Sequence, residues 1–348
     1  MTSKKGNAEK IYINEIIRVT YKCNWKCKFC NVLKTNNFGE QDVTDKEIIY
    51  QILKLIKKYT VEQRQKLILS FSGGEPTLNK NLLKYIRLAK EIGVGVVEIQ
   101  TNGTKLFKEK NYVLKLIEAG LDEIFLAQHS GNDDINKQLG SYYSINDFKD
   151  WTKYIIDNNI NKKISIYLNI VVTKINLYSI YDYISLLLEI GFINIIPKRD
   201  HFGGNKTHKI SFGFVQPNGY AELNKEEVLI KYSENDIIEV DKIVNLCRQN
   251  NILPDFHFVC PPLCVLDYPE YNLEHERMKK LRIDEKNGTI NNGNFESYKY
   301  LWKEKQKFDE CSKCKYNDYC LGFYKNWVSF VGDDYAKEKI NNFLKNGK

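Results

Sequence analysis

The chain has 348 residues, of which 43% are hydrophobic and 13% aromatic, and 52 basic against 44 acidic residues give a net charge of +8. This length accommodates one large domain and a smaller one, because single cores seldom grow beyond about 250 to 300 residues. The composition is that of an ordinary globular protein, and the absence of any run of about 18 apolar residues excludes a membrane-spanning chain.

The N-terminal segment MTSKKGNAEK is polar and has no apolar stretch that could export it, so we expect a cytoplasmic protein with no membrane partner. The lysines are scattered along most of the chain, which indicates solvated faces and speaks against a dedicated nucleic-acid surface. The net positive charge is compatible with an acidic partner.

The expected organisation is an N-terminal tail (1–13), a core domain (14–222), a helical connector (223–253), a Cys-rich module (254–335) and a C-terminal tail (336–348).

From residue 14 to about 200, short apolar runs alternate with amphipathic stretches. The runs predict six strands, at 15–20, 66–72, 95–101, 121–128, 164–173 and 192–198. The helices between them have clear end signals, such as the capping box of Thr44 with Glu47 and the closing glycines Gly93, Gly120 and Gly191.

Strands that alternate with helices favour an α/β fold with a parallel sheet and right-handed crossovers. Six strands are too few for a complete eight-stranded barrel, so we expect a partial barrel or an open sheet. The irregular segment 199–222, which contains RDHFGGNKTHK, is expected to be a long loop or a connector, and residues 224–250 are expected to be helical.

Eight of the nine cysteines fall into two groups, at residues 23–30 and 260–320, while Cys247 stands alone in the apolar register of IVNLCRQ and is predicted to be buried. Close cysteine spacing in a cytosolic chain indicates metal binding or redox chemistry more than a disulfide framework.

Cys23, Cys27 and Cys30 follow the first predicted strand with the spacing C-x3-C-x2-C. Three thiolates on a [4Fe-4S] cluster leave one iron with an open coordination position, which is a binding site. The alternative is a structural zinc ion whose fourth ligand comes from elsewhere. Iron–sulfur is favoured because no Cys or His lies close by to complete a compact zinc knuckle.

Polar segments follow the next three predicted strands: SGGEP (72–76), TNG (101–103) and QHSGND (128–133). In parallel α/β folds the reactive groups lie on the loops at these strand ends. The glycines of GGEP offer bare backbone to which a ligand can come close, and Glu75 can accept hydrogen bonds from a cationic amine.

The cysteine triplet, with Phe29 before its last member, and the segment Gly73, Gly74, Glu75 and Pro76 one strand later resemble the signature of radical S-adenosylmethionine (SAM) enzymes. The resemblance covers about residues 14–200 and implies a partial (β/α)6 TIM-like barrel. It also implies that the amine and carboxylate of SAM chelate the open iron, with the amine near the GGEP backbone and Glu75. One electron, from a reductant such as a flavodoxin or ferredoxin, then cleaves SAM to a 5′-deoxyadenosyl radical that abstracts hydrogen from a substrate.

Further contacts follow from the same resemblance. Ribose contacts are expected from the polar residues after the third and fourth strands, namely Thr101, Asn102, Gln128 and Ser130, although TNG is also an ordinary turn sequence. His129 is either a hydrogen-bond donor or proton relay at the site or an imidazole packed at a strand end, and the packed interpretation is favoured. His201, His208 and His257 are expected to be surface or packing residues.

The second cysteine group, CSKCKYNDYC (311–320) preceded by CPPLC (260–264), resembles the C-terminal SPASM or twitch extension of the same superfamily. The resemblance implies an auxiliary [4Fe-4S] cluster, after a hairpin at 281–293 that turns at Asn287 and Gly288. The usual further cysteine is missing after Cys320, which argues for one auxiliary cluster. Its expected ligands are Cys264, Cys311, Cys314 and Cys320, with Cys260 as the substitute for Cys264. A structural zinc ion on the same thiolates is the alternative.

Four protein thiolates would exclude direct substrate ligation, which leaves electron transfer or structural support for the auxiliary cluster. By resemblance to the subfamily, the expected substrate is a peptide or protein side chain. A small molecule or an RNA base is the alternative within the enzyme class, and a zinc-thiolate binding protein without turnover is the alternative outside it.

Overall fold

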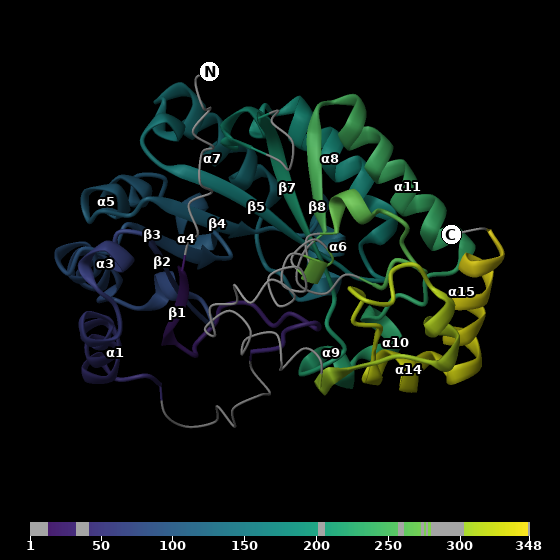
Figure 1. Cartoon of the computed structure of the whole chain (residues 1–348). Coiled ribbons are helices and arrows are strands. Elements are labelled where there is room, and N and C mark those ends of the chain that lie inside the picture. Colours follow the sequence, from purple (N-terminus) through teal and green to yellow (C-terminus); the bar gives the residue numbers. More distant parts are fainter. Residues whose placement is uncertain are drawn as a thin grey trace, which may run out of the picture. The chain divides into compact units, whose positions relative to one another are not determined.

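The structure is a computed structural model, and it describes residues 13–32, 42–200, 206–256, 261–272, 275, 278–279 and 303–346. The chain divides into two compact units. The first unit comprises Met1–Asn24, Asn37–Ala127 and Asn146–Tyr167, and the second comprises Trp25–Asn36, Gln128–Ile145 and Leu168–Lys348. Both units combine parallel strands with helices, which confirms the predicted α/β class (Figure 1).

The first unit contains four strands that pair in chain order and in parallel: β1 (Ile13–Thr20), β2 (Leu67–Gly73), β3 (Val96–Thr101) and β4 (Glu123–Ala127). One row of apolar side chains crosses all four strands, from Ile17 through Phe71 and Ile99 to Ile124, and each of these residues is at most 4% exposed. This row determines the register, because a slip of one residue would turn the apolar side chains to the other face of the sheet.

The α-helices of this unit are α1 (Asp45–Lys58), α2 (Val61–Arg64), α3 (Leu82–Glu91), α4 (Thr104–Lys108), α5 (Tyr112–Glu118) and α7 (Ile145–Asp157), and two 3-10 turns are η1 (Pro76–Leu78) and η2 (Ile160–Lys162). Figure 1 shows α1, α3 and α5 along the outer side of the strands. The predicted capping box of Thr44 and Glu47 opens α1 and is confirmed. Gly93 and Gly120 follow α3 and α5 with φ values of +86° and +98°, which confirms both predicted helix ends.

In the second unit, β5 (Ser165–Val172) pairs from Leu168 onward with β7 (Lys206–Phe214), which pairs in parallel with β8 (Ile252–Phe256) and antiparallel with β6 (Lys198–Asp200). A separate antiparallel pair is formed by β9 (Lys305–Gln306) and β10 (Phe323–Tyr324). The α-helices are α6 (Asp133–Leu139), α8 (Ile180–Glu189), α9 (Tyr220–Leu223), α10 (Lys225–Val228), α11 (Glu234–Gln249), α14 (Lys325–Val331) and α15 (Asp333–Lys345). The 3-10 turns are η3 (Leu177–Ser179), η4 (Phe192–Ile195), η5 (Pro269–Tyr271) and η6 (Asp309–Lys313).

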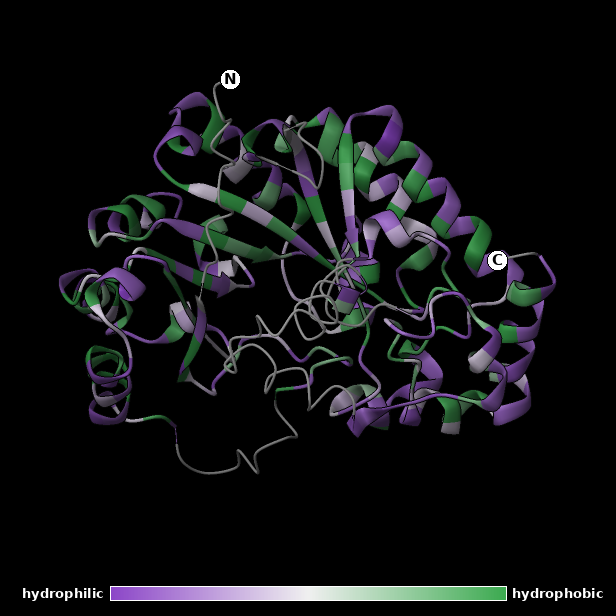
Figure 2. Ribbon diagram, in the orientation of Figure 1, coloured by the Kyte–Doolittle hydropathy of each residue, from purple (hydrophilic) through white to green (hydrophobic). Residues whose placement is uncertain are grey.

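Helix α11 contacts both α8 and β8, and Figure 2 shows it alternating between hydrophobic and hydrophilic residues along its length. Its buried positions include Val240, Ile243, Val244 and Cys247. Cys247 is fully buried, as predicted from its apolar register, and burial raises the pKa of its thiol to about 12. Among the described residues, no helix is both long and apolar enough to cross a membrane.

The predicted sixth strand was wrong. Residues 192–195 form the 3-10 turn η4, and the long parallel strand is β7, inside the segment that was expected to be a loop or connector. The apolar residues of the run FINII are buried in a tight turn after Gly191, whereas Ile210, Phe212 and Phe214 alternate with Ser211 and Gly213 on β7, and all five of these β7 residues are buried. This strand was not predicted because its alternating residues lie among Gly and Lys residues.

The domain boundaries expected from the sequence stay a prediction.

The main-chain pairing of β1 with β2 continues beyond the strands. After a register shift between Arg18 and Thr20, the Gly74 N–H donates to the Thr20 carbonyl at 2.8 Å and the Glu75 N–H to the Lys22 carbonyl at 2.8 Å. A Cβ on Gly73, which has a φ of +148°, would lie 2.0 Å from the Thr20 oxygen, and one on Gly74 would lie 2.2 Å from the Lys22 oxygen. The two glycines therefore let residues 73–75 lie directly against residues 20–22, the stretch that leads into Cys23.

We expect Gly74→Ala to lower the free energy of unfolding by about 1 to 3 kcal/mol, the usual cost of overpacking, because a main-chain atom must move to admit the methyl group. Gly213→Ala is the control, since its Cβ would meet only the Asn169 Oδ1, at 3.8 Å. Alanine inside a strand loses less conformational entropy on folding than glycine does. The free energy of unfolding of Gly213→Ala should therefore equal or slightly exceed that of wild type. Denaturant unfolding of both variants checks this, and equal midpoints would contradict it.

Candidate active site

At the strand ends of the first unit the Glu75 side chain accepts four hydrogen bonds. It is 1% exposed, and its Oε1 accepts from the Thr77 N–H at 3.0 Å, the Thr77 hydroxyl at 2.6 Å and the Thr101 hydroxyl at 2.7 Å, while its Oε2 accepts from the Asn102 N–H at 2.7 Å. Burial raises the pKa of this carboxyl, and the four donors act against that rise. Glu75 thus joins the end of β2 to the end of β3.

Asn102 extends this network toward the first cysteine. Its Nδ2 donates to Asn24 Oδ1 at 2.7 Å, and its Oδ1 accepts from the Thr104 N–H at 3.0 Å. Since Asn24 directly follows Cys23, the TNG turn, the GGEP segment and the start of the cysteine loop form one hydrogen-bonded assembly. Thr101 is 2% exposed, and its hydroxyl donates to Glu75 and accepts from the Gly103 N–H.

Asp42 anchors the other side of the stretch before Cys23. Its carboxylate accepts from the Thr20 hydroxyl at 2.8 Å, the Tyr21 N–H at 2.8 Å and the Val43 N–H at 3.0 Å. Burial raises the pKa of this carboxyl, but the hydrogen bonds from Tyr21, Thr20 and Val43 outweigh that effect and the net pKa is lowered. Sequence reasoning missed Asp42 and Asn24, because neither lies at a diagnostic spacing from the motif residues that they support.

In the second unit, Cys27 and Cys30 lie on one tight turn in which the Cys30 N–H donates to the Cys27 carbonyl at 3.1 Å. The N–H groups of Lys26 and Lys28 donate to the carbonyls of Gly140 and Leu139 at 2.9 and 3.0 Å, at the end of α6. A Cβ on Gly140 would lie 2.1 Å from the Lys26 oxygen, so the close approach requires glycine. Both thiols are partly exposed.

His129 packs against this loop. The imidazole is 2% exposed, its Nδ1 accepts from the Val171 N–H at 3.1 Å, and its ring lies 5.0 Å from that of Phe29 and 6.1 Å from that of Trp25, both edge-on. Burial lowers the pKa of His129 to about 3, so the ring is neutral at physiological pH. The packed interpretation of His129 is therefore confirmed.

The remaining predicted ribose contacts are also buried. Gln128 and Ser130 are 0% exposed, the Gln128 N–H donates to the Asn169 carbonyl at 3.1 Å, and Ser130 Oγ accepts from the Asn132 N–H at 3.2 Å. Cys23 and the residues around Glu75 belong to the first unit, whereas Cys27, Cys30, Gln128 and Ser130 belong to the second. The contacts of these residues with a nucleotide stay a prediction.

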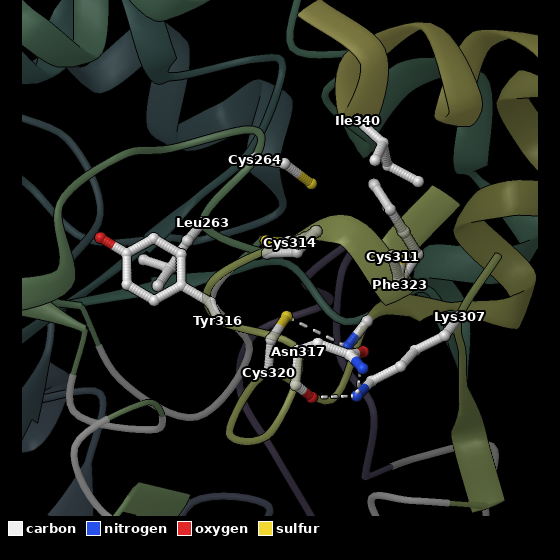
Figure 3. A pocket seen from close by; sticks show the side chains of 12 residues that line it. Leu263, Cys264, Lys307, Cys311, Cys314, Tyr316, Asn317, Cys320, Phe323 and Ile340 are labelled. Atoms are coloured by element: carbon white, nitrogen blue, oxygen red, sulfur yellow. Dashed lines mark hydrogen bonds between the residues drawn. The ribbon is translucent and has the colours of Figure 1, made fainter. Parts of the chain in front are cut away.

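Four thiols of the C-terminal module line one hollow, which Figure 3 shows: those of Cys264, Cys311, Cys314 and Cys320. Leu263, Phe323 and Ile340 give it apolar walls. The pKa of the Cys264 thiol is raised first by burial and then by the thiols of Cys320, Cys311 and Cys314, which lie near enough to repel its negative charge.

The loop that carries these cysteines is closed by its own backbone. The Cys314 N–H donates to the Cys311 carbonyl at 3.0 Å, the Cys320 N–H to the Tyr316 carbonyl at 2.8 Å, and the Gly322 N–H to the Cys320 sulfur at 3.3 Å. Within the described ranges no three Cys, His, Asp or Glu side chains lie close enough together to hold one metal ion. The fit of the hollow to a cluster therefore rests on its four thiols, its apolar walls and the N–H group directed at sulfur.

Some predicted features lie outside the described residues: Cys260, the hairpin at 281–293 with Asn287 and Gly288, His201 and His257. His208 is described, and its Nδ1 lies 2.7 Å from the Ile196 carbonyl oxygen, between β6 and β7. This contact agrees with a packing role.

Comparisons with known proteins agree with this arrangement. A model described as the radical SAM superfamily matches residues 17–186. A curated protein named probable GTP 3′,8-cyclase, from Saccharolobus solfataricus, is 26% identical over 242 residues, which cover 70% of this chain and 68% of that protein.

Two solved structures share the fold. Native anSMEcpe with bound AdoMet and Cp18Cys peptide aligns with a TM-score of 0.55 and 15% identity over 96% of both chains. Streptococcus suis SuiB bound to precursor peptide SuiA aligns with a TM-score of 0.50 and 18% identity over 72% of this chain, which spans only 50% of the SuiB chain.

The fold is the partial TIM-like α/β barrel expected from the sequence. The matched residues include the cysteine triplet and the GGEP segment, which follow β1 and β2. Residues 17–186 therefore form a domain of the radical SAM superfamily, whose members use SAM and a [4Fe-4S] cluster, and the Cys-rich C-terminal module is consistent with the SPASM or twitch type.

Proposed function

We propose that Cys23, Cys27 and Cys30 hold a [4Fe-4S] cluster with one open iron, and that the segment 73–76 binds the SAM that occupies it. The observation that carries this proposal is the Glu75 network. This network reaches both neighbours of Cys23: the Glu75 N–H donates to the Lys22 carbonyl, and Asn102 donates to the Asn24 side chain. The open iron carries no protein ligand. The cysteines that hold the other three irons must therefore be kept in place by hydrogen bonds from the surrounding chain.

When bound, the cluster and SAM supply reductive cleavage to a 5′-deoxyadenosyl radical, which abstracts hydrogen from the substrate. The residues of the chain position and shield these groups. Trp25 stacks on Tyr143 at 5.6 Å and His129 and Phe29 pack edge-on, so aromatic contacts hold residues of the loop that carries Cys27 and Cys30.

For the C-terminal module we propose an auxiliary [4Fe-4S] cluster held by Cys264, Cys311, Cys314 and Cys320, with Cys260 as the substitute for Cys264. Four thiolates fill the four iron positions and leave none for a substrate, so this cluster transfers electrons or supports the module. A flavodoxin or ferredoxin is the proposed source of electrons for the chain.

The proposed substrate is a peptide or protein side chain, which the enzyme modifies as a maturase. The likeness in fold to anSMEcpe, whose structure contains a peptide, extends over 96% of both chains and supports this choice. The second candidate is a small molecule, and the relative named as a probable GTP 3′,8-cyclase favours it.

Replacing Cys23, Cys27 or Cys30 by Ala should abolish the formation of 5′-deoxyadenosine from SAM under reducing conditions. We expect a loss greater than the roughly 100-fold that removal of a ligand's supporting partner causes. Cys247→Ala is the control, because this thiol is buried in α11 and should leave cleavage unchanged. If a triplet variant forms 5′-deoxyadenosine at the wild-type rate, the assignment of the first cluster is wrong.

Cys314→Ala should lower the iron content of the anaerobically purified protein by about half, from about eight to about four irons per chain, because only the auxiliary cluster is lost. The EPR signal that responds to SAM should persist. Iron and sulfide analysis beside Cys247→Ala measures this. Unchanged iron would refute the auxiliary site, and zinc in place of iron would support the structural alternative.

The two substrate classes differ in what consumes the radical. With reduced enzyme and SAM, a synthetic Cys-containing peptide should raise the rate of 5′-deoxyadenosine formation and lose hydrogen, seen as a decrease of about 2 Da for a two-electron oxidation. GTP should do neither. Consumption of GTP with formation of 5′-deoxyadenosine, and no change in the mass of the peptide, would favour the small-molecule function instead.

A further inference from the structure

The loop that carries Cys27 and Cys30 is held from a second side, by the segment after β7. This segment, residues 216–227, contains the short helices α9 and α10 and belongs to the same unit as the loop. None of its residues belongs to the superfamily motifs quoted above. Two of its hydrogen bonds with the loop are directed at main-chain carbonyl groups, and two others join side chains.

Gly219 and Tyr220 contact the end of the loop. The Tyr220 N–H donates to the Cys30 carbonyl at 2.9 Å. Gly219 has a φ of +60°, and a Cβ there would lie 2.8 Å from the Cys30 oxygen and 2.9 Å from the Asn31 Cα. Only glycine therefore allows the segment to come this close.

Asn224 holds the middle of the loop. Its Nδ2 donates to the Lys28 carbonyl at 3.1 Å and to the Tyr220 carbonyl at 2.9 Å, so one amide group ties α9 to the loop. Asn31 Nδ2 donates to Gln216 Oε1 at 2.8 Å. Two carbonyls of the loop, those of Lys28 and Cys30, are thus bonded to this segment.

Apolar contacts add to these bonds. Phe29, between Lys28 and Cys30, packs against a buried cluster formed by Val215, Ala221, Val228 and Leu229. Since Ala221 and Val228 come from α9 and α10, the side chain of Phe29 and the carbonyls beside it are held by the same short helices.

The far side of the segment is anchored to the C-terminal helix α14, which begins five residues after Cys320. Asn326 Nδ2 donates to the Pro217 carbonyl at 2.9 Å, and Phe330 packs on the same apolar cluster as Phe29. Trp327 Nε1 donates to the Ile230 carbonyl at 2.8 Å. The segment therefore lies between the Cys27–Cys30 loop and the helix that follows the second cysteine group.

We propose that residues 216–227 are a clasp that holds the Cys27–Cys30 loop in its cluster-binding conformation, with Gly219 and Asn224 as positioning residues and Asn326 as its anchor on the auxiliary module. The inference rests on the proposed role of Cys27 and Cys30 as cluster ligands. It goes beyond that role, because it makes the geometry of the first cluster site depend on the C-terminal module.

The first test uses the full-length chain before clusters are inserted, so it does not depend on cofactor chemistry. Hydrogen–deuterium exchange of residues 26–31 should be about fivefold faster in Asn224→Ala and in Asn326→Ala, the factor that the loss of one ordinary hydrogen bond produces. Asn250→Ala is the matched control, because Asn250 Nδ2 makes the same bond to a carbonyl four residues earlier, at 2.9 Å, but lies at the end of α11. Gly219→Ala is compared with Gly332→Ala, which has a φ of +92° and no atom within 4 Å of its Cβ.

The second test uses the reconstituted enzyme. Asn224→Ala and Gly219→Ala should change the EPR line shape that SAM perturbs and retain less iron in the first site. Asn250→Ala should match wild type, and Gly332→Ala, which has backbone strain without a clash, should change both less than Gly219→Ala does. If wild type itself shows no SAM-sensitive signal, the proposed function fails. If wild type shows it and the clasp variants equal their controls in exchange and EPR, the clasp is overturned. Unchanged exchange in Asn326→Ala alone would overturn the anchoring role of α14.

Discussion

The hydrogen-bonded carboxylate of Glu75 is the interaction on which the order of the site depends. A buried carboxylate is tolerated only when it is well hydrogen-bonded, and Glu75 has four donors from two strand ends. Two of those donors are backbone N–H groups, so the carboxylate constrains the turns themselves as well as side chains. Through Asn102 and Asn24 this constraint reaches the residue beside Cys23. The polar cluster thus organises backbone that a cofactor would need to find already in place.

Two different physical means hold the cysteines of the triplet. Residues 20–24, which lead into and past Cys23, accept hydrogen bonds from the GGEP segment and Asn102 and donate to the Asp42 carboxylate. The turn of Cys27 and Cys30 is held by the end of α6, by aromatic packing on His129 and by the clasp at 216–227. In both places glycines admit main chain where any Cβ would collide, at Gly74 against Lys22 and at Gly219 against Cys30. These glycines allow two segments of main chain to lie in contact. From the sequence, the glycines of GGEP were instead predicted to leave room for a ligand.

The motifs could be predicted from sequence because their chemistry fixes their spacing. The triplet, GGEP and the second cysteine group were found that way, and so were the burial of Cys247 and the capping box of α1. The strand β7 was missed because its alternating Ile210, Phe212 and Phe214 lie among Lys, His and Gly, and the apolar run at 192–196 was a more obvious candidate. Asp42, Asn24 and Asn224 could not be found, since each acts on main-chain groups or amides far away in sequence. Such partners follow no local pattern and become visible only when the fold is known.

Under the proposed assignment the two cysteine groups meet opposite requirements. A site with three thiolates must expose one metal position, so the turns that carry its ligands must be held by the surrounding chain. The triplet cysteines are partly exposed, as are the four cysteines of the C-terminal module. The hollow of the C-terminal module has four thiols, apolar walls and an N–H group directed at the Cys320 sulfur. Burial and hydrogen bonds to sulfur are the levers that set the potential of a cluster, whereas substrate binding needs an open iron. The construction of the second site therefore favours electron transfer or support over chemistry on the substrate. A relative that shares the barrel sequence can differ in what it modifies, because substrate choice depends on residues outside the shared motifs.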